Sequence, residues 1–215
     1  MTVVPEGLNI HHEDPLFIVV EKPSGLLSVP GKGEANQDCV VNRLKQLYPD
    51  CIDQPSVHRL DQDTSGLIVM ARTEAVHRIL SGQFMDRLVG KRYIALLEGL
   101  VEEQAGLIEL AFRLDPDNRP YQVYDPEKGK LGTTRWRMLG VENGMTRVEF
   151  MPLTGRTHQL RLHAAHKKGL GVPIVGDRLY GTGTAPGQLK LHASILRFRH
   201  PKTRQPMEFV SPPPF

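Results

Sequence analysis

The chain has 215 residues, 40% of them hydrophobic and 24% charged, which is ordinary for a soluble globular protein. No apolar run is long enough to span a bilayer, and the N-terminal segment lacks the hydrophobic region of a secretory signal, so a membrane protein and a secreted protein are both disfavoured. Cys39 and Cys51 have no disulfide or metal-binding spacing and are typical of reduced thiols. We expect one domain over residues 1–215, located in the cytoplasm.

The net charge of +3 hides a strong asymmetry along the chain. Residues 1–70 contain five lysines and arginines against ten acidic residues, whereas residues 71–215 contain 22 against 14. Between Arg156 and Arg204 there are ten basic residues and a single acid, Asp177, together with five of the nine histidines. Such a block is a candidate phosphate-binding surface, although a solvated basic face is the commoner explanation at this net charge.

The first part of the chain predicts two strands and two helices. Short apolar runs at 16–20 and 67–71 are typical of buried strands. Apolar residues recur at helical spacing over residues 40–48, and Pro49 ends this pattern. Thr73 is a suitable N-cap for a second helix. That helix would bury Val76, Ile79, Leu80 and Phe84.

The remainder of the chain predicts mostly strands. They are expected, in chain order, over residues 91–101, 106–112, 133–140, 145–151, 189–198 and 207–210. Asn143-Gly144 is a strong hairpin signal between two of these strands. Residues 115–132 are rich in Pro, Asp, Asn and Gly, which predicts a long loop with one short strand at most. A third helix, capped by Thr154 or Thr157, would run toward a stop at Gly169.

The predicted elements are mostly strands, with three helices and no regular alternation of strand and helix. We therefore predict an α+β fold built on a largely antiparallel mixed sheet that is flanked by helices and loops. No phosphate-cradling glycine motif follows a predicted strand, which disfavours a doubly wound nucleotide-binding fold.

One polar stretch stands directly before the strand at 67–71: Val57-His58-Arg59-Leu60-Asp61-Gln62-Asp63-Thr64-Ser65-Gly66. Polar groups on a tight loop that leads into a rigid strand are precisely placed, as in many active sites. Taken alone, the stretch is better explained as an Asx-type turn in which Asp61 and Asp63 accept bonds from backbone amides. As a site, it would hold one carboxylate kept ionised by an arginine, with Arg59 and Arg161 as candidates, and would bind a polyanion.

Two other kinds of site are weaker. A metal site would combine the histidines between His158 and His166 with His58, Asp61 and Asp63. No HExxH or His-x-His pattern is present and the neighbouring residues are basic, so we expect no metal. A Ser/His/Asp hydrolase is disfavoured because no Gly-x-Ser-x-Gly elbow occurs.

The stretch His58-Arg59-Leu60-Asp61, followed by Thr64-Ser65-Gly66, resembles the signature loop of the RluA-type RNA pseudouridine synthases. Further motifs similar to those of this family follow in the family's order and cover nearly the whole chain. They are Lys22-Pro23-Ser24-Gly25 with Val29-Pro30, Lys91-Arg92-Tyr93-Ile94-Ala95, one block made of Gly155-Arg156-Thr157-His158-Gln159-Leu160-Arg161-Leu162-His163 and Pro173-Ile174-Val175-Gly176-Asp177, and Leu191-His192-Ala193. Four or five motifs in one order are not expected by chance.

The chain is most similar to the compact RluA branch of this family. Only about 15 residues precede the first predicted strand, and Asp117-Asn118-Arg119-Pro120 also resembles that branch. The resemblance implies the pseudouridine synthase catalytic fold with a central cleft. It also implies that residues 1–15 form an N-terminal extension and that there is no separate RNA-binding domain.

For the site, the resemblance implies that Asp61 is the catalytic aspartate, which attacks the uridine or deprotonates its sugar. Tyr93 would stack on the base, although without the resemblance it is an ordinary half-buried strand residue. Arg161 would form a salt bridge that positions Asp61, and Arg59 would help to hold the RNA open where the target nucleotide is flipped out. Phosphate contacts would come from the basic block, with Arg156, Lys167 and Lys168 as candidates.

The implied reaction is the isomerisation of a uridine in structured RNA, either in 23S ribosomal RNA, in the tRNA anticodon stem-loop or in both. It keeps all atoms and is redox-neutral, so no cofactor is expected, and nothing in the sequence demands a partner subunit. The alternative is a non-catalytic RNA-binding or ribosome-assembly protein of the same fold. A metal-dependent phosphoesterase that uses the histidines ranks third. His58 and Asp63 receive no role.

Overall fold

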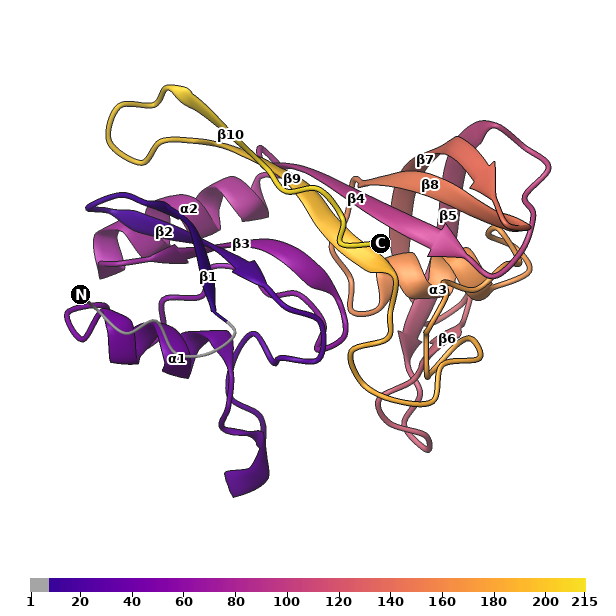
Figure 1. Cartoon of the computed structure of the whole chain (residues 1–215), viewed down its shortest axis with the longest axis horizontal. Coiled ribbons are helices and arrows are strands. Elements are labelled where there is room, and N and C mark those ends of the chain that lie inside the picture. The colour runs from indigo at the N-terminus through magenta and orange to yellow at the C-terminus, as the bar shows by residue number, and fades with distance from the viewer. Residues whose placement is uncertain (1–7) are drawn as a thin grey trace. The chain divides into compact units, whose positions relative to one another are not determined.

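The computed structural model describes residues 8–215, which form two compact units (Figure 1). The first unit combines the described part of the chain up to Lys91 with residues 192–214. The second unit contains residues 92–191 and Phe215. Each unit has its own strands and its own apolar core. That residues 1–215 act as a single domain stays a prediction.

The strands of the first unit are β1 (Asn9–Glu13), β2 (Phe17–Lys22), β3 (Ser65–Ala71), β9 (Leu191–Arg199) and β10 (Pro206–Val210). β2 pairs antiparallel with β1 and β3, and β10 pairs antiparallel with β9. β3 and β9 run parallel where Ser65 faces His192 and Gly66 faces Ala193. Every residue of β3 is buried, which agrees with its continuous apolar sequence.

Two helices pack onto this sheet (Figure 1). α2 (Glu74–Met85) begins as predicted, because the Thr73 hydroxyl accepts a hydrogen bond from the Val76 N–H at 3.3 Å. Its Val76 and Leu80 join the core formed by β2, β3, β9 and β10. α1 (Val40–Leu47) also matches its prediction, but its N-cap is the Cys39 thiol, which accepts from the Asn42 N–H at 3.4 Å. A short 3-10 helix, Glu34–Asn36, was not predicted.

The strands of the second unit are β4 (Gly90–Leu97), β5 (Ala105–Leu114), β6 (Gln122–Tyr124), β7 (Lys130–Glu142) and β8 (Met145–Pro152). They pair in the order β4-β8-β7-β5-β6, and all of these pairs are antiparallel. α3 (Gln159–Ala165) lies beside these strands (Figure 1), and its Leu160, Leu162 and Ala164 belong to their core. β6 is the short strand expected inside the 115–132 loop.

The prediction of an α+β fold on a largely antiparallel sheet is confirmed, but two local predictions are wrong. The first correction concerns β1, a strand that was not predicted and that precedes the first predicted strand at 16–20. This strand carries few apolar residues, so its sequence shows no alternation, and histidines supply its packing surface instead. The imidazole of His12 stacks on Phe17 at 5.7 Å, and that of His11 meets Phe209 edge-on at 6.2 Å.

The start of α3 is the second correction. His158 stands at the N-cap in the left-handed region, with φ of 56°, and neither predicted threonine caps the helix. Thr154 instead accepts from the Thr133 N–H at 2.9 Å and donates to Gln159 Oε1 at 2.7 Å. A partner on β7 therefore competes successfully for the hydroxyl that a local cap would use. The helix ends at Ala165, before Gly169.

No helix in the described residues is both long and apolar enough to cross a membrane.

Gly66 permits the close approach of β3 to β9. It has a φ of 109°, and a Cβ atom added there would lie 2.4 Å from the Ala193 carbonyl oxygen. We expect Gly66→Ala to lower the free energy of unfolding by about 3–5 kcal/mol, because backbone strain and overpacking add.

Gly144→Ala is the control, since Gly144 has a φ of 76° and open space around it. It should cost only about 1–2 kcal/mol. Urea unfolding would measure both, and equal losses would contradict the close-approach explanation.

Candidate active site

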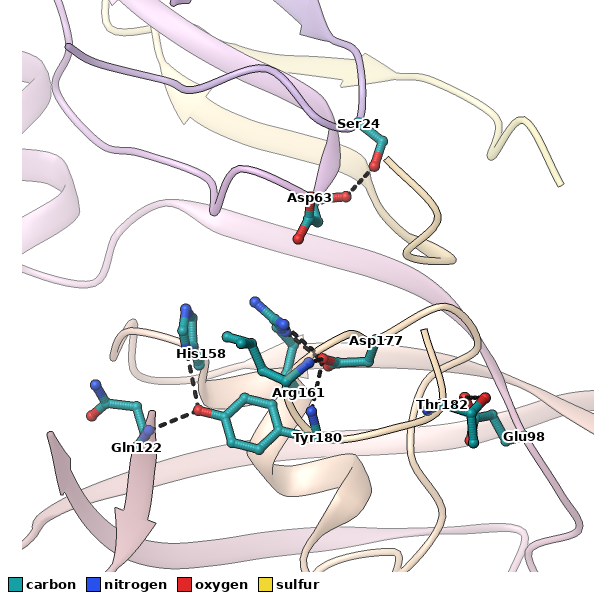
Figure 2. A network of polar contacts seen from close by, with 10 residues as sticks. Ser24, Asp63, Glu98, Gln122, His158, Arg161, Asp177, Tyr180 and Thr182 are labelled. Atoms are coloured by element: carbon teal, nitrogen blue, oxygen red, sulfur yellow. Dashed lines mark hydrogen bonds and ion pairs between the residues drawn. The ribbon is translucent and has the colours of Figure 1, made fainter. Parts of the chain in front are cut away.

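The polar stretch at 57–64 forms a loop that leads directly into β3. The Thr64 N–H donates to the Asp61 carbonyl oxygen at 3.1 Å, so a main-chain bond closes the turn that carries Asp61. The Asp61 side chain is half-buried. The Ser24 hydroxyl donates to the carbonyl oxygen of Asp63, which fixes the other end of the turn (Figure 2). The backbone around Asp61 is therefore held by bonds that do not use its carboxylate.

A second loop, residues 22–28, fixes the Asp61 loop from outside. The Ser28 hydroxyl donates to the Leu60 carbonyl at 2.7 Å and accepts from the Leu60 N–H at 3.0 Å. The Gly25 N–H donates to the Gln62 carbonyl at 3.0 Å, and the Gln62 side-chain amide donates back to the Gly25 carbonyl at 3.1 Å. Two sequence motifs more than thirty residues apart thus form one hydrogen-bonded assembly.

Lys22 stands at the centre of this assembly. Its side chain is fully buried, and its ammonium donates to the carbonyl oxygens of Pro23 at 2.9 Å, Leu26 at 2.7 Å and Gln62 at 2.8 Å. Burial lowers the pKa of Lys22 to about 7, while the charges of Asp63 and Asp61 act in the opposite direction. The three carbonyls match the three N–H donors of an ammonium. Lys22 is therefore the hydrogen-bond donor around which the Asp61 loop is built.

His58 connects the same loop to the sheet and to α2. The Val69 N–H donates to His58 Nε2 at 3.1 Å, and the imidazole stacks on Phe84 with centroids 4.3 Å apart. Burial, reinforced by the charge of Lys91, lowers the pKa of His58 to about 3. The ring is therefore neutral at pH 7 and accepts a bond through Nε2, so its contacts are those of a brace for the loop.

The two predicted support residues lie in the second unit. Tyr93 belongs to β4, opposite Phe150 of β8, and its half-buried ring packs against the core. Arg161 belongs to α3 and is 2% exposed. Its Nε donates to Asp177 Oδ2 at 2.8 Å and its Nη2 to Asp177 Oδ1 at 2.6 Å, so the ion pair is bidentate (Figure 2). Burial alone would raise the pKa of Asp177, but the hydrogen bond and charge of Arg161, together with hydrogen bonds from the N–H groups of Leu179 and Tyr180, outweigh it and hold that pKa below its usual value.

Tyr180 completes the surroundings of Arg161 (Figure 2). The Arg161 guanidinium lies over the Tyr180 ring, 5.4 Å from its centroid. The phenol oxygen accepts from the Gln122 N–H at 2.8 Å and lies 2.9 Å from His158 Nδ1. A main-chain N–H of β6 and the N-cap histidine of α3 therefore hold the hydroxyl of Tyr180, whose ring lies against the Arg161 guanidinium.

The predicted RNA contacts are all exposed: Arg59, Arg156, Lys167 and Lys168. Lys168 lies over the Tyr124 ring at 4.8 Å and donates to the phenol oxygen at 3.2 Å. Their roles in RNA binding stay predictions.

The described residues contain no group of histidine, cysteine and acidic side chains with the arrangement of a metal site. His163, one of the histidines considered for such a site, is fully buried on α3 and meets Phe112 edge-on at 5.9 Å. Burial lowers the pKa of His163 to about 4. A neutral imidazole inside an apolar core is thus the state that folding selects.

A family model described as RNA pseudouridylate synthase matches residues 16–166. The dual-specificity RNA pseudouridine synthase RluA of Pasteurella multocida is 43% identical over 97% of this chain and 94% of its own length. The protein of the same name from Escherichia coli K12 is 41% identical with the same coverage.

The chain belongs to the RNA pseudouridylate synthase family. It is therefore an isomerase, as the motifs predicted, and the non-catalytic alternative gains no support.

Solved structures of RNA pseudouridylate synthase domains have a fold similar to that of this chain. Human RNA pseudouridylate synthase domain containing 1 superposes with a TM-score of 0.77 at 29% identity, over 98% of this chain and 85% of that one. Human RNA pseudouridylate synthase domain containing 4 shares the fold, with a TM-score of 0.75 at 24% identity, over 96% of this chain and 88% of that one. The predicted pseudouridine synthase fold is thus confirmed, whereas the roles of individual site residues stay predictions.

Sequence reasoning missed three residues of this site: Lys22 and Asp177, which stand in the quoted motifs without a role, and Tyr180, which lies outside those motifs. Asp177 could have been found from the sequence, because it is the single acidic residue in a basic block. An isolated carboxylate among basic side chains is expected to form an ion pair with an arginine. No sequence pattern points to Lys22 or Tyr180, because their contacts come from segments far away in the sequence.

Removing the Lys22 ammonium should loosen the Asp61 loop. We expect Lys22→Met to lower the free energy of unfolding by about 3 kcal/mol or more, because three buried carbonyls lose their donor. Lys45→Met, which removes an exposed ion pair with Asp53 in the same unit, should leave the urea midpoint unchanged. A midpoint for Lys22→Met that equals the wild-type value would contradict the anchoring role.

Proposed function

We propose that this synthase converts uridine to pseudouridine in structured RNA, in large-subunit ribosomal RNA, in the tRNA anticodon stem-loop or in both. The RluA relatives carry the words dual-specificity in their names, and they are similar to this chain over almost its whole length. The observation that carries the proposal is the turn of Asp61, whose backbone is held by Thr64, Ser24 and Lys22 through main-chain atoms. A side chain on so fixed a backbone is preorganised for chemistry.

In the proposed reaction, Asp61 attacks the uridine or removes a proton from its sugar, and the bond between N1 of the base and the anomeric carbon breaks. The uracil rotates within the pocket, and its carbon 5 forms a new bond to the anomeric carbon. Carbon 5 then loses its proton, while N1 gains one, so atoms and electrons balance. Because the reaction is an isomerisation, the proposal includes no cofactor.

The supporting roles follow from the chemistry of each side chain. Tyr93 would stack on the uracil and could assist the last proton removal, since an aromatic face suits a flipped base. Arg161 would pair with the Asp61 carboxylate and keep it oriented. Arg59 would occupy the gap that the flipped nucleotide leaves in the RNA. The remaining RNA contacts would be made to phosphates by Arg156, Lys167 and Lys168.

We further propose that the synthase acts as a monomer in the cytoplasm. Its catalytic residues would all come from one chain. Cys39 and Cys51 are both free and buried, which agrees with a reducing compartment.

Release of tritium from RNA labelled at carbon 5 of uracil tests the proposed chemistry directly. We expect Asp61→Asn to abolish release, with RNA affinity within about threefold of wild type. Asp53→Asn is the matched control, because it makes the same change at an exposed carboxylate in the same unit, and it should retain full activity. Full release by Asp61→Asn would remove Asp61 from the mechanism. Salt-sensitive binding without release by the wild-type chain would favour the non-catalytic alternative.

The phosphate-contact residues have a different expected signature. Lys167→Ala and Lys168→Ala together should reduce the slope of log affinity against log salt by about one to two, one for each lost phosphate contact. The rate at saturating RNA should not change, because neither residue is proposed to touch the reacting nucleotide. Lys128→Ala, another exposed lysine of the same unit, serves as the control. An unchanged slope in the double variant would place these lysines outside the RNA path.

A further inference from the structure

We infer that Asp177 and Tyr180 are positioning residues, which act on the reaction by fixing the guanidinium of Arg161. The inference rests on the proposed function, because it needs Arg161 to serve the catalytic carboxylate. Neither residue is proposed to touch the RNA.

The ion pair between Arg161 and Asp177 has the geometry of a rigid clamp. Both carboxylate oxygens are used, at 2.8 and 2.6 Å, and the two side chains are 3% and 0% exposed. A bidentate pair constrains the plane of the guanidinium as well as its distance. The edge formed by Nε and Nη2 is therefore committed to Asp177, which fixes the direction in which the other edge points.

Asp177 is itself immobilised by the loop that follows it. Its Oδ1 accepts from the N–H groups of Leu179 at 2.9 Å and Tyr180 at 3.0 Å. Its carbonyl oxygen accepts from the N–H groups of Gly181 and Gly183 at 3.0 and 3.1 Å. Because main-chain and side-chain atoms are both bound, the carboxylate cannot turn without breaking the loop.

Tyr180 restricts the remaining freedom of the guanidinium. Its ring lies beneath the carbon of the guanidinium at 5.4 Å, and the ring is tethered through its hydroxyl to the Gln122 N–H and to His158 Nδ1 (Figure 2). The ion pair thus holds one edge of the guanidinium, and the ring packs against its carbon. Together they restrict the orientation of Arg161.

A buried ion pair can also be purely structural, so burial alone does not establish this role. Replacing such a pair with apolar residues is often neutral or stabilising, and the pair contributes orientation more than stability. An orientation effect on catalysis is separable from a folding effect, because it lowers the rate at saturating RNA while leaving RNA affinity unchanged. Misplacement by about 1 Å can cost about 100-fold in rate.

The test is a double-mutant cycle with Asp177→Asn, Arg161→Met and the double variant, assayed by tritium release at saturating RNA. We expect Asp177→Asn to lower kcat by about 100-fold, with the RNA Kd within about twofold of wild type. In the Arg161→Met background, Asp177→Asn should change kcat by less than about twofold, because it acts only through Arg161. Independent effects that multiply in the double variant would overturn the inference.

The structure supplies a matched control in the same unit. Asp125 also binds an arginine, Arg113, at 2.5 Å, and it also accepts from the N–H groups two and three residues later, at 3.1 and 2.9 Å. Asp125→Asn therefore makes the same chemical change to the same motif away from Arg161, and it should leave kcat within about twofold. An equal loss of kcat in both variants would show a structural effect and overturn the inference.

A milder variant covers the case in which Asp177→Asn does not fold, as judged by its melting temperature. Tyr180→Phe keeps the ring and removes only the two hydrogen bonds of the tether, so kcat should fall by about fivefold or more, since about fivefold corresponds to one hydrogen bond. It should have no effect in the Arg161→Met background, and an unchanged kcat in the wild-type background would overturn the inference. Failure of the proposed function is recognised separately, because wild-type protein would then release no tritium.

Discussion

A single buried ammonium, that of Lys22, organises the loop that carries the predicted catalytic aspartate. It satisfies three carbonyl oxygens, one of them forty residues away in the Asp61 loop. Around it, Ser24, Gly25 and Ser28 add further bonds to the same loop. An ammonium without these partners would be too costly to bury, and the carbonyls without the ammonium would be unsatisfied. The two loops therefore become ordered together or not at all.

The second unit uses the same principle, but its buried cation is held by a carboxylate instead of by carbonyl groups. There the buried cation is Arg161, and a carboxylate, Asp177, is what fixes it. In both units a charged group is taken out of water and surrounded by groups that cannot be rearranged. Such burial contributes little net stability, but it selects one geometry. The proposed reaction depends on orienting a flipped nucleoside, and one fixed geometry is what it would require of the protein.

Much of the fold could be predicted from local pattern. β2, β3, α1 and α2 have apolar residues at the spacing of buried strands and helices, and their structures agree with it. Prediction failed where packing came from residues outside the pattern. β1 packs through histidines, and Thr154 binds β7 instead of capping α3. In each case a partner distant in the sequence outweighed the local preference.

The order and content of its motifs were enough, from the sequence by itself, to determine the family, the kind of reaction and the identity of the predicted catalytic residue. The family, the reaction and the predicted catalytic residue depend on which residue types are present and in what order, and the sequence gives both directly. Only the tertiary structure decided what holds those residues in place: Asp177 beside Arg161, carbonyls from two loops around Lys22, and a neutral His58 against β3 and α2. Hydrogen bonds and ion pairs act over a few ångströms, so their partners are chosen by how the chain folds, and spacing along the sequence does not reveal them.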